Sequence, residues 1–393
     1  MIREKIDQAI GILREKEIDM WITFVRESSI TGDPMLSYIC DIGVTWQSAF
    51  ILTAKGERIA IVGQYDVASL RESGHYQEIL GYVESAREHL RSVVLSRDPR
   101  KIALNYNTSI PTSDGLTTGM YMNLQSFLKD TPYPERFISA EPVISSLRGR
   151  KTPEEIRRIR EACRRTLNLF DQAGTFMAPG RSEAEVAAHV LSLVEANGYS
   201  LSWDRDHCPA VYSGPGTAGA HASPTARHIQ PGHLINMDFG VRCEGYCADL
   251  QRTWYVLRPG ENEAPEAVRR AFRVLRESVE LARKAMRPGV TGVAVDRAAR
   301  HHLVENGYAE FPHGLGHQVG RETHDGGALL GPAWEKYGSS VHLPLEAGQV
   351  FTIEPRITLE DYGIVTLEEE VVLGESGCDY LNPPQEELLY IRG

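Results

Sequence analysis

Two segments of this chain repeat each other without a gap. They are MAPGRSEAEVAAHVLSLVEANGY (residues 177–199) and MRPGVTGVAVDRAARHHLVENGY (residues 286–308), with seven identities in 23 positions and Ser182 replaced by Thr291. One interpretation is two similar capped helices, each ending at an Asn-Gly stop. The other is a duplicated α+β half-domain. Duplication predicts an equivalent hairpin after each helix and a site between the hairpins, and the sequence contains two hairpin patterns that fit.

The first hairpin pattern carries two aspartates. Residues 234–256, LINMDFGVRCEGYCADLQRTWYV, read as two strands joined by a turn at residues 244–245. A two-residue turn there pairs Asp238 with Gln251, so Asp238 and Asp249 become diagonal neighbours on one face of the sheet. Two adjacent ionised carboxylates repel each other, which costs free energy unless a positive charge lies between them.

The second hairpin pattern, QVFTIEPRITLEDYGIVTLEEEVV (residues 349–372), carries Glu354 and Glu368 on successive strands. A loop with an odd number of residues, such as 359–363, places the two carboxylates on the same face, whereas a four-residue loop separates them. The three glutamates at 368–370 also fit an exposed edge strand. We favour Glu368 as a ligand because the other hairpin carries a matching pair of acids.

A glycine-rich stretch between the hairpins carries three histidines. It reads HGLGHQVGRETHD and contains His313, His317 and His324. Its glycines oppose a regular helix and predict a loop and strand with close backbone approach.

Together the hairpins and this stretch offer a set of metal ligands. The set is one neutral histidine with the four acids Asp238, Asp249, Glu354 and Glu368, a total charge of −4 that matches two divalent cations. Oxygen-rich ligation with one imidazole suits manganese, cobalt, iron or zinc. Two such ions would activate a bridging water as a hydroxide nucleophile, which predicts hydrolysis.

Composition excludes several classes of partner. The chain of 393 residues has 42 basic and 53 acidic residues and a net charge of −11, which argues against a nucleic-acid partner. The N-terminal segment mixes charges into a helical period, unlike a signal or transit peptide, and no apolar run approaches the ~18 residues of a membrane span. The six scattered cysteines favour a reducing environment. We therefore expect a cytoplasmic protein with no nucleic-acid or membrane partner.

The chain divides into two predicted domains. Residues 1–146 alternate helix-like segments with strand-like ones such as MWITFV (20–25), an α/β pattern without a phosphate-binding loop. Thr152, followed three residues later by Glu155, forms a capping-box signature that opens a long helix. We place the second, α+β domain at residues 147–393.

At these motifs the chain resembles the pita-bread metallopeptidases, which include aminopeptidase P, prolidase and the metal-free relative creatinase. The resemblance covers essentially the whole chain, since a creatinase-like N-terminal domain before a duplicated pita-bread catalytic domain is the arrangement of aminopeptidase P and prolidase. It implies hydrolysis of Xaa-Pro bonds in short peptides, as an aminopeptidase or a dipeptidase, by attack of a hydroxide that bridges two metal ions. Manganese is the expected metal, and a homodimer is the expected assembly.

The family's motifs also imply site residues. The aspartates eleven residues apart, the H-G-x-G-H pattern and TIEP with a glutamate fourteen residues on imply five metal ligands: Asp238, Asp249, His317, Glu354 and Glu368. Glu354 is also the expected general base, and His324 is expected to bind the scissile carbonyl or to shuttle a proton. The resemblance also covers an upstream histidine segment, SGPGTAGAHASPTARHI, and implies His221 as a catalytic and substrate-contact residue. His313 is a further candidate for substrate binding.

Three positions depart from the family pattern. Thr366 stands in place of an arginine, Arg356 in place of the glycine after Glu-Pro, and the arginine that prolidases carry after the catalytic histidine is missing. Arg356 or Arg321 is the candidate to bind a dipeptide carboxylate instead. These departures leave open a family member with non-peptide chemistry, such as a creatinase-like hydrolase or a lyase. A non-catalytic binding protein on the same scaffold is the third alternative.

Overall fold

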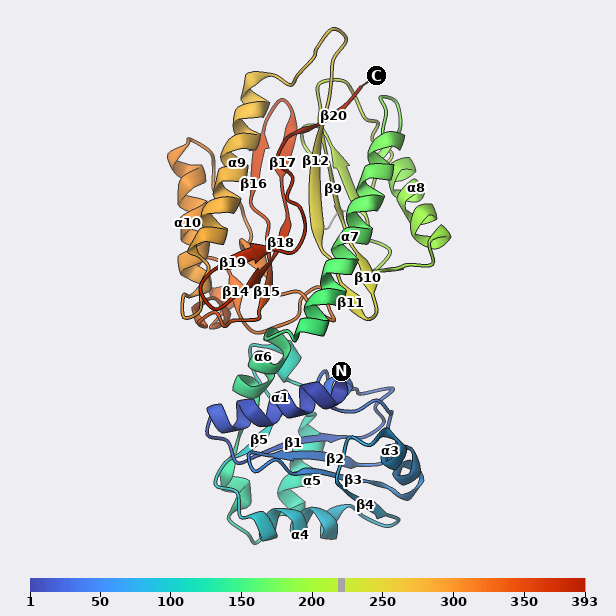
Figure 1. Cartoon of the computed structure of the whole chain (residues 1–393), viewed down its shortest axis with the longest axis vertical. Helices are drawn as coiled ribbons and strands as arrows, with labels where there is room; N and C mark the ends of the chain where they lie inside the picture. The colour runs from blue at the N-terminus through green and yellow to red at the C-terminus, as the bar shows by residue number, and fades with distance from the viewer. Residues whose placement is uncertain (218–222, 393) are drawn as a thin grey trace. The chain divides into compact units, whose positions relative to one another are not determined.

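The computed structural model describes residues 1–217 and 223–392, so the predicted residue His221 lies outside the described residues. The chain forms two compact units, Met1–Arg148 and Gly149–Gly393, which run from blue to green and from green to red in Figure 1. None of the helices in the described part of the chain combines the length and the apolar character that crossing a bilayer would require.

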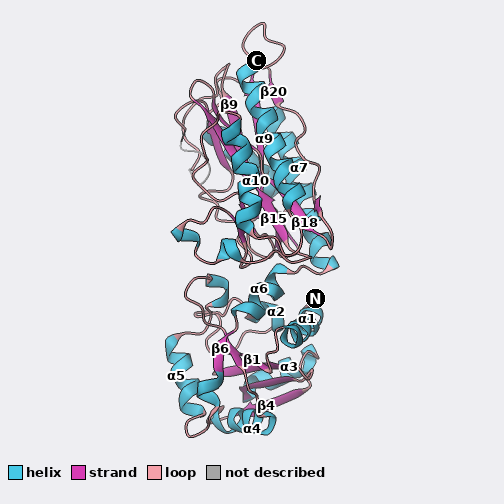
Figure 2. Cartoon of the chain, turned by 90° about the vertical axis from the view of Figure 1, so that its left-hand side faces the viewer, coloured by secondary structure: helices cyan, strands magenta, loops and turns pink. Residues whose placement is uncertain are grey.

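The first unit is a mixed six-stranded sheet with helices on both faces (Figure 2). In spatial order, the strands are β4 (Glu78–Tyr82), β3 (Arg58–Gly63), β2 (Ser48–Thr53), β1 (Met20–Val25), β5 (Ile102–Leu104) and β6 (Phe137–Ser139). The helices are α1 (Ile2–Glu15), α2 (Leu36–Ile39), α3 (Val67–Ser73), α4 (Arg87–Arg97), α5 (Thr118–Phe127) and α6 (Glu141–Gly149). Strand β1 has the bounds predicted for MWITFV.

Strand β1 supplies both cores of this unit because its side chains alternate between faces. Trp21 packs in one cluster with residues of α1 and α6. Ile22 and Phe24 pack in another cluster with residues of α4 and α5. All six residues of the strand are buried, which explains why five of them are apolar.

The described residues of the second unit, 149–217 and 223–392, combine four long helices with five small sheets. The helices are α7 (Pro153–Phe176), α8 (Glu183–Ala196), α9 (Glu266–Ala285) and α10 (Gly292–Glu305). The first half contains β7 (Ser200–Leu201), β8 (Ala210–Ser213), β9 (Leu234–Phe239), β10 (Val241–Cys243), β11 (Tyr246–Cys247) and β12 (Leu250–Val256). The second half contains β13 (Gly316–His317), β14 (Leu329–Leu330), β15 (Val350–Ile353), β16 (Arg356–Leu359), β17 (Gly363–Thr366), β18 (Glu369–Leu373), β19 (Cys378–Tyr380) and β20 (Leu389–Ile391). The strand orders are β20-β12-β9-β8, β11-β10-β7, β15-β18-β19, β16-β17 and β13-β14.

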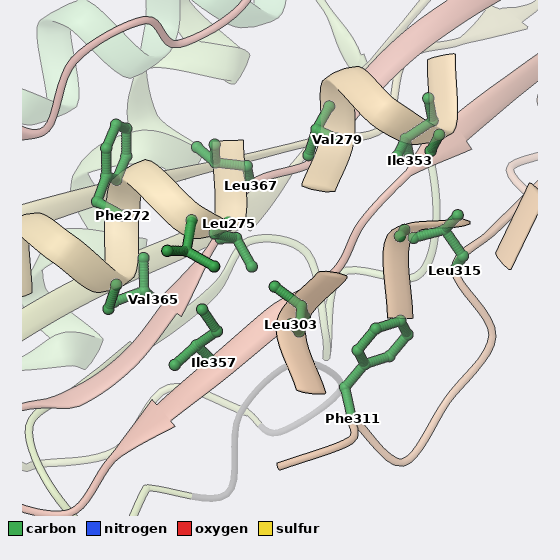
Figure 3. Packing of buried hydrophobic residues seen from close by; sticks show 14 of the residues in the cluster. Phe272, Leu275, Val279, Leu303, Phe311, Leu315, Ile353, Ile357, Val365 and Leu367 are labelled. Atoms are coloured by element: carbon green, nitrogen blue, oxygen red, sulfur yellow. The ribbon is translucent and has the colours of Figure 1, made fainter. Parts of the chain in front are cut away.

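Each half of this unit packs helices against its own strands (Figure 1). Helix α9 lies on β15, β16 and β17, whereas α7 lies on β10, β11 and β12. Figure 3 shows the core under α9, where Phe272 and Leu275 belong to one buried cluster with Leu303 of α10 and Val365 of β17. Strand β17 also packs beside β9, which brings the two hairpins together.

The two repeated segments form matching helices. Helices α8 and α10 each span 14 residues, and Ser182 and Thr291 are their N-cap residues. Gly180 and Gly289, two residues before the caps, share a φ of +87°, a left-handed value that glycine adopts without strain. The repeats therefore have the same local structure, and duplication of the complete halves stays a prediction.

Helix α7 begins at the predicted capping box. The Oγ1 atom of Thr152 accepts a hydrogen bond from the backbone N–H of Glu155, whose Oε2 accepts from the backbone N–H of Thr152 at 2.8 Å. The Oε1 atom of Glu155 accepts from the Tyr246 hydroxyl at 3.0 Å, and this hydroxyl accepts from Nε of Arg321 at 3.1 Å. The cap thereby anchors both β11 and the histidine-bearing stretch.

Candidate metal centre and active site

The register of the first hairpin is the predicted one. Strands β9 and β12 pair antiparallel with Asp238 opposite Gln251. The turn residues Glu244 and Gly245 have φ values of +48° and +84°, both positive as a type I′ turn requires. Asp238 lies near the end of β9 and Asp249 directly precedes β12. Both are buried, with exposed fractions of 7% and 6%.

The second hairpin has the odd loop that places its two predicted ligands on one face. Strands β16 and β17 pair with Leu359 opposite Gly363, and β15 and β18 pair in the same register. Continued between these pairs, that register puts Glu354 opposite Glu368. The two carboxylates therefore share a face of the hairpin.

The three glutamates at 368–370 are buried, so the interpretation as an exposed edge strand is wrong. Glu368, Glu369 and Glu370 have exposed fractions of 0%, 1% and 0%. The Oε2 atom of Glu369 lies 3.1 Å from Nη2 of Arg252. The Oε1 atom of Glu370 accepts a hydrogen bond from the backbone N–H of Asp249 at 2.7 Å. Glu369 and Glu370 thus tie the second hairpin to the first.

The histidine stretch is a loop with one short strand, as predicted. Strand β13 runs so close to β15 that a Cβ atom on Gly316 would lie 2.0 Å from the carbonyl oxygen of Thr352, so only glycine fits there. The rings of His317 and His324 meet edge to face, with their centroids 4.3 Å apart.

A buried ion pair holds the loop between these two histidines. The Nζ atom of Lys151 lies 3.5 Å from Oδ2 of Asp325, and neither side chain is exposed. The same oxygen accepts from the backbone N–H of Arg321 at 2.8 Å, and the backbone N–H of Asp325 donates to the Gln318 carbonyl at 2.8 Å. Because buried charges are costly unless paired, Lys151 stabilises the carboxylate that closes this loop.

Side chains from both hairpins and the histidine stretch come together in one cluster. The Nε2 atom of His317 lies 3.5 Å from Oδ2 of Asp249, 3.5 Å from Oε1 of Glu354 and 3.9 Å from Oε1 of Glu368. One donor atom each from Asp249, His317 and Glu368 lie within 4.8 Å of one another. Asp238 joins the cluster through a hydrogen bond with Asp249. Three acids therefore surround one imidazole, and the fourth, Asp238, lies beside Asp249.

Burial raises the pKa of every acid in this cluster. It raises the pKa of Asp238 to about 7, while the hydrogen bond with Asp249 acts in the opposite direction. The pKa values of Asp249, Glu354 and Glu368 are raised well above their usual range by burial first and by repulsion from neighbouring carboxylates second. Carboxylates held this close are costly without a cation.

This donor set fits divalent cations. Among the described residues, Oδ1 of Asp238 and Oε1 of Glu368 are buried atoms with no hydrogen-bond partner. Coordination to a metal would satisfy both oxygens. The Nδ1 atom of His317 faces the Gln318 carbonyl at 3.3 Å, which directs Nε2 toward the acids in the manner of a metal-binding histidine. Four carboxylates and one imidazole suit manganese, cobalt, iron or zinc.

The remaining predicted site residues have varied surroundings. His221 lies outside the described residues. The ring of His313 packs against Phe311, with centroids 5.0 Å apart. Arg356 is partly buried and lies directly opposite Thr366, so the two departures from the family pattern form one cross-strand pair beside the two glutamates. The roles of these three residues stay predictions.

Sequence reasoning missed the polar residues that support the cluster. Gln251 donates a hydrogen bond to Glu368, and Glu370 accepts one from Asp249. Lys151, outside both hairpins, forms the buried pair described above. Gln251 and Glu370 could have been found from spacing, because each lies two residues after an expected ligand, Asp249 or Glu368, and strand alternation puts such residues on the same face.

Comparison with known proteins identifies relatives of this chain. The model of metallopeptidase family M24 matches residues 157–375, more than half of the chain. The Xaa-Pro dipeptidase of Pyrococcus furiosus is 31% identical over 271 residues, which cover 68% of this chain and 73% of that protein. The uncharacterized peptidase YqhT of Bacillus subtilis is 29% identical over 280 residues, which cover 71% of this chain and 73% of that protein.

Solved structures match along essentially the whole chain. An Xaa-Pro dipeptidase from Bacillus anthracis superimposes with a TM-score of 0.73 at 24% identity, covering 100% of both chains. An X-Pro aminopeptidase from Thermotoga maritima MSB8 superimposes with a TM-score of 0.70 at 24% identity, covering 98% of this chain and 99% of the other. These likenesses show a shared fold.

The fold and the buried cluster of acids and imidazole define a metal-dependent hydrolase. The chain belongs to metallopeptidase family M24. It is a metallopeptidase with an α/β first unit and a pita-bread second unit, and the predicted resemblance and fold class are confirmed. Membership of the family implies the use of divalent metal, for which the cluster offers the ligands.

Proposed function

We propose that this chain is a dinuclear peptidase that hydrolyses Xaa-Pro bonds in short peptides, with residues 147–393 as its catalytic domain and residues 1–146 as a creatinase-like domain. The proposed metal is manganese, with cobalt, zinc and iron as alternatives, and the proposed ligands are Asp238, Asp249, His317, Glu354 and Glu368. The proposal rests on the convergence of the Asp249, His317 and Glu368 donor atoms within 4.8 Å. The choice of Xaa-Pro bonds rests on the similarity to an Xaa-Pro dipeptidase.

The side chains of the cluster suit peptide hydrolysis. When bound, the ions would lower the pKa of a water molecule and polarise the scissile carbonyl. Glu354 would accept a proton from the attacking water on its carboxylate and deliver it to the proline nitrogen, since its carboxylate lies among the proposed ligands, 3.5 Å from Nε2 of His317. His324, whose ring lies against His317, would donate a hydrogen bond to the scissile carbonyl oxygen. The products are a carboxylate and the released proline amine.

A panel of peptides tests this function. Protein treated with a chelator and then supplied with Mn²⁺ should hydrolyse an Xaa-Pro dipeptide, and the chelator alone should abolish turnover. The matched control is the same dipeptide with alanine in place of proline. Failure to hydrolyse any peptide would contradict the proposal and favour non-peptide chemistry, which the departures at Arg356 and Thr366 motivate.

Arg356 is the cation that we propose for the substrate carboxylate. It lies opposite Thr366, next to the two glutamates of the cluster. Burial raises the pKa of the Tyr212 phenol, and the Arg356 guanidinium opposes this shift, so its charge lies within electrostatic reach of Tyr212. The alternative cation, Arg321, donates from Nε to the Tyr246 hydroxyl at 3.1 Å. Arg356 is therefore the better candidate.

Replacement of Arg356 by alanine should discriminate between dipeptides and tripeptides. We expect KM for an Xaa-Pro dipeptide to rise about 10-fold or more, because a hydrogen bond to a charged group contributes roughly 1.5–3 kcal/mol. KM for an Xaa-Pro-Yaa tripeptide, whose carboxylate lies one residue further on, should change little. Arg321→Ala is the matched control and should affect both substrates alike. An equal rise in both KM values for Arg356→Ala would exclude the assignment.

A further inference from the structure

Gln251 connects the two hairpins beside the cluster. Its side chain is buried, with an exposed fraction of 3%. In the first hairpin it lies opposite Asp238. It also forms an isolated antiparallel bridge with Glu368 of the second hairpin, in which each backbone N–H points to the other carbonyl at 3.4 Å. Gln251 therefore contacts proposed ligands from both halves.

The amide of Gln251 has partners at both ends. Its Nε2 donates a hydrogen bond to Oε2 of Glu368 at 2.8 Å. Its Oε1 accepts from the Thr366 hydroxyl at 3.0 Å and from the Tyr212 hydroxyl at 3.3 Å. An ionised carboxylate only accepts hydrogen bonds, whereas both hydroxyls can donate. These partners select one orientation of the amide, with its nitrogen toward Glu368.

This arrangement makes the two oxygens of Glu368 unequal. Oε2 is held by Gln251. Oε1 is buried, has no hydrogen-bond partner among the described residues, and lies 3.9 Å from Nε2 of His317. The oxygen without a partner is therefore the one that faces the other donor atoms. Thr366, which replaces the arginine of the family pattern, supplies one of the two hydroxyls that orient the amide.

We propose that Gln251 is a positioning residue that holds Oε2 of Glu368 and thereby turns Oε1 toward the metal, with Tyr212 and Thr366 setting the direction of its amide. This inference rests on the proposed function, because it takes Glu368 to be a metal ligand. Hydrogen bonds to ligand atoms restrict their orientation before the metal binds, so their loss weakens metal binding. A Gln251 with only a structural role would stabilise the fold without affecting metal affinity.

Calorimetric titration of chelator-treated protein with Mn²⁺ tests the proposal. Gln251→Leu keeps the size of the side chain and removes the amide, and it should weaken Mn²⁺ affinity by about 10- to 100-fold. The matched control is Gln385→Leu, another buried glutamine, whose Nε2 donates to the Thr253 carbonyl at 2.8 Å. Both variants should lower the Tm of the metal-free protein, but Gln385→Leu should retain the wild-type affinity.

A second variant tests the orientation of the amide without removing it. Tyr212→Phe with Thr366→Val eliminates both hydroxyl donors, and we expect a loss of Mn²⁺ affinity of about 3- to 10-fold, the range for a lost hydrogen bond. Wild-type affinity in Gln251→Leu, or in this double variant, would overturn the proposal, as would an equal loss in Gln385→Leu. Failure of the wild-type protein itself to bind Mn²⁺ would instead contradict the proposed function.

Discussion

Replacement of Glu354 by glutamine should lower kcat for an Xaa-Pro dipeptide by about 10³-fold, within the range of roughly 10²- to 10⁴-fold that general acid–base catalysis contributes. The amide has nearly the same size as the carboxylate but cannot accept and release the proton. Glu354 lies opposite Glu368 in the hairpin register and 3.5 Å from Nε2 of His317, so the substituted group stays beside the reacting atoms.

The measurement is steady-state hydrolysis at saturating Mn²⁺, with circular dichroism to verify the fold. Glu360→Gln is the matched control, because Glu360 is exposed on the loop of the same hairpin. It should retain the wild-type kcat. A Glu354→Gln variant with wild-type kcat in the presence of metal would remove Glu354 from the proposed mechanism.

Replacement of Asp249 by asparagine should eliminate tight metal binding and, with it, activity. We expect Mn²⁺ affinity to fall more than about 100-fold, because even the hydrogen-bond partners of metal ligands typically contribute 10- to 100-fold. The same substitution should stabilise the metal-free protein, by an amount on the order of 1–3 kcal/mol, since it removes a buried charge. Function and stability of the metal-free fold therefore oppose each other at this position.

The gain in stability should depend on pH with a defined sign. Burial and neighbouring carboxylates raise the pKa of Asp249 above its unfolded value, and burial raises that of Asp238 to about 7. The native state then binds more protons than the unfolded state, so the free energy of unfolding of the metal-free protein falls as pH rises from about 4 to about 7. Asp249→Asn removes one of these groups, so its advantage should be small at pH 4 and larger at pH 7.

Chemical denaturation at both pH values, with and without Mn²⁺, measures this effect. Saturating Mn²⁺ should reverse the order, because only the wild-type protein gains binding energy. Asp361→Asn, at an exposed position in the loop of the second hairpin, is the control and should match the wild type throughout. If the metal-free Asp249→Asn variant were less stable than the wild type at pH 7, the Asp249 carboxylate would not destabilise the metal-free fold.

Local patterns predicted the features that depend on neighbours in the chain. Pairing in a hairpin is counted outward from its turn, so the turn at residues 244–245 determined that Asp238 lies opposite Gln251. The capping box at Thr152 and strand β1 also follow from local residue types and were predicted correctly. The same counting left the second hairpin open between two loop lengths, because no Asn-Gly or Asp-Gly turn marks its loop.

The edge-strand alternative failed for a different reason. A run of three glutamates is usually exposed, and residue types alone do not show which distant side chains pack against it. The burial of residues 368–370 depends on Arg252, which pairs with Glu369, and on the backbone N–H of Asp249, which meets Glu370. Both partners come from the other hairpin and lie more than a hundred positions away in the sequence.

Strand alternation and turn counting operate over a few residues, so the sequence alone predicted that Asp238 and Asp249 share a face of the first hairpin. The choice of His317 and Glu368 came from the family motifs rather than from this counting. Only the tertiary structure decided what holds these groups in place. The packing of β17 beside β9 brings Glu368 to Gln251, and the fold of the histidine stretch brings Asp325 to Lys151. The physical reason is that such contacts depend on how segments distant in the sequence pack against each other. Neither residue spacing nor local propensity specifies this packing.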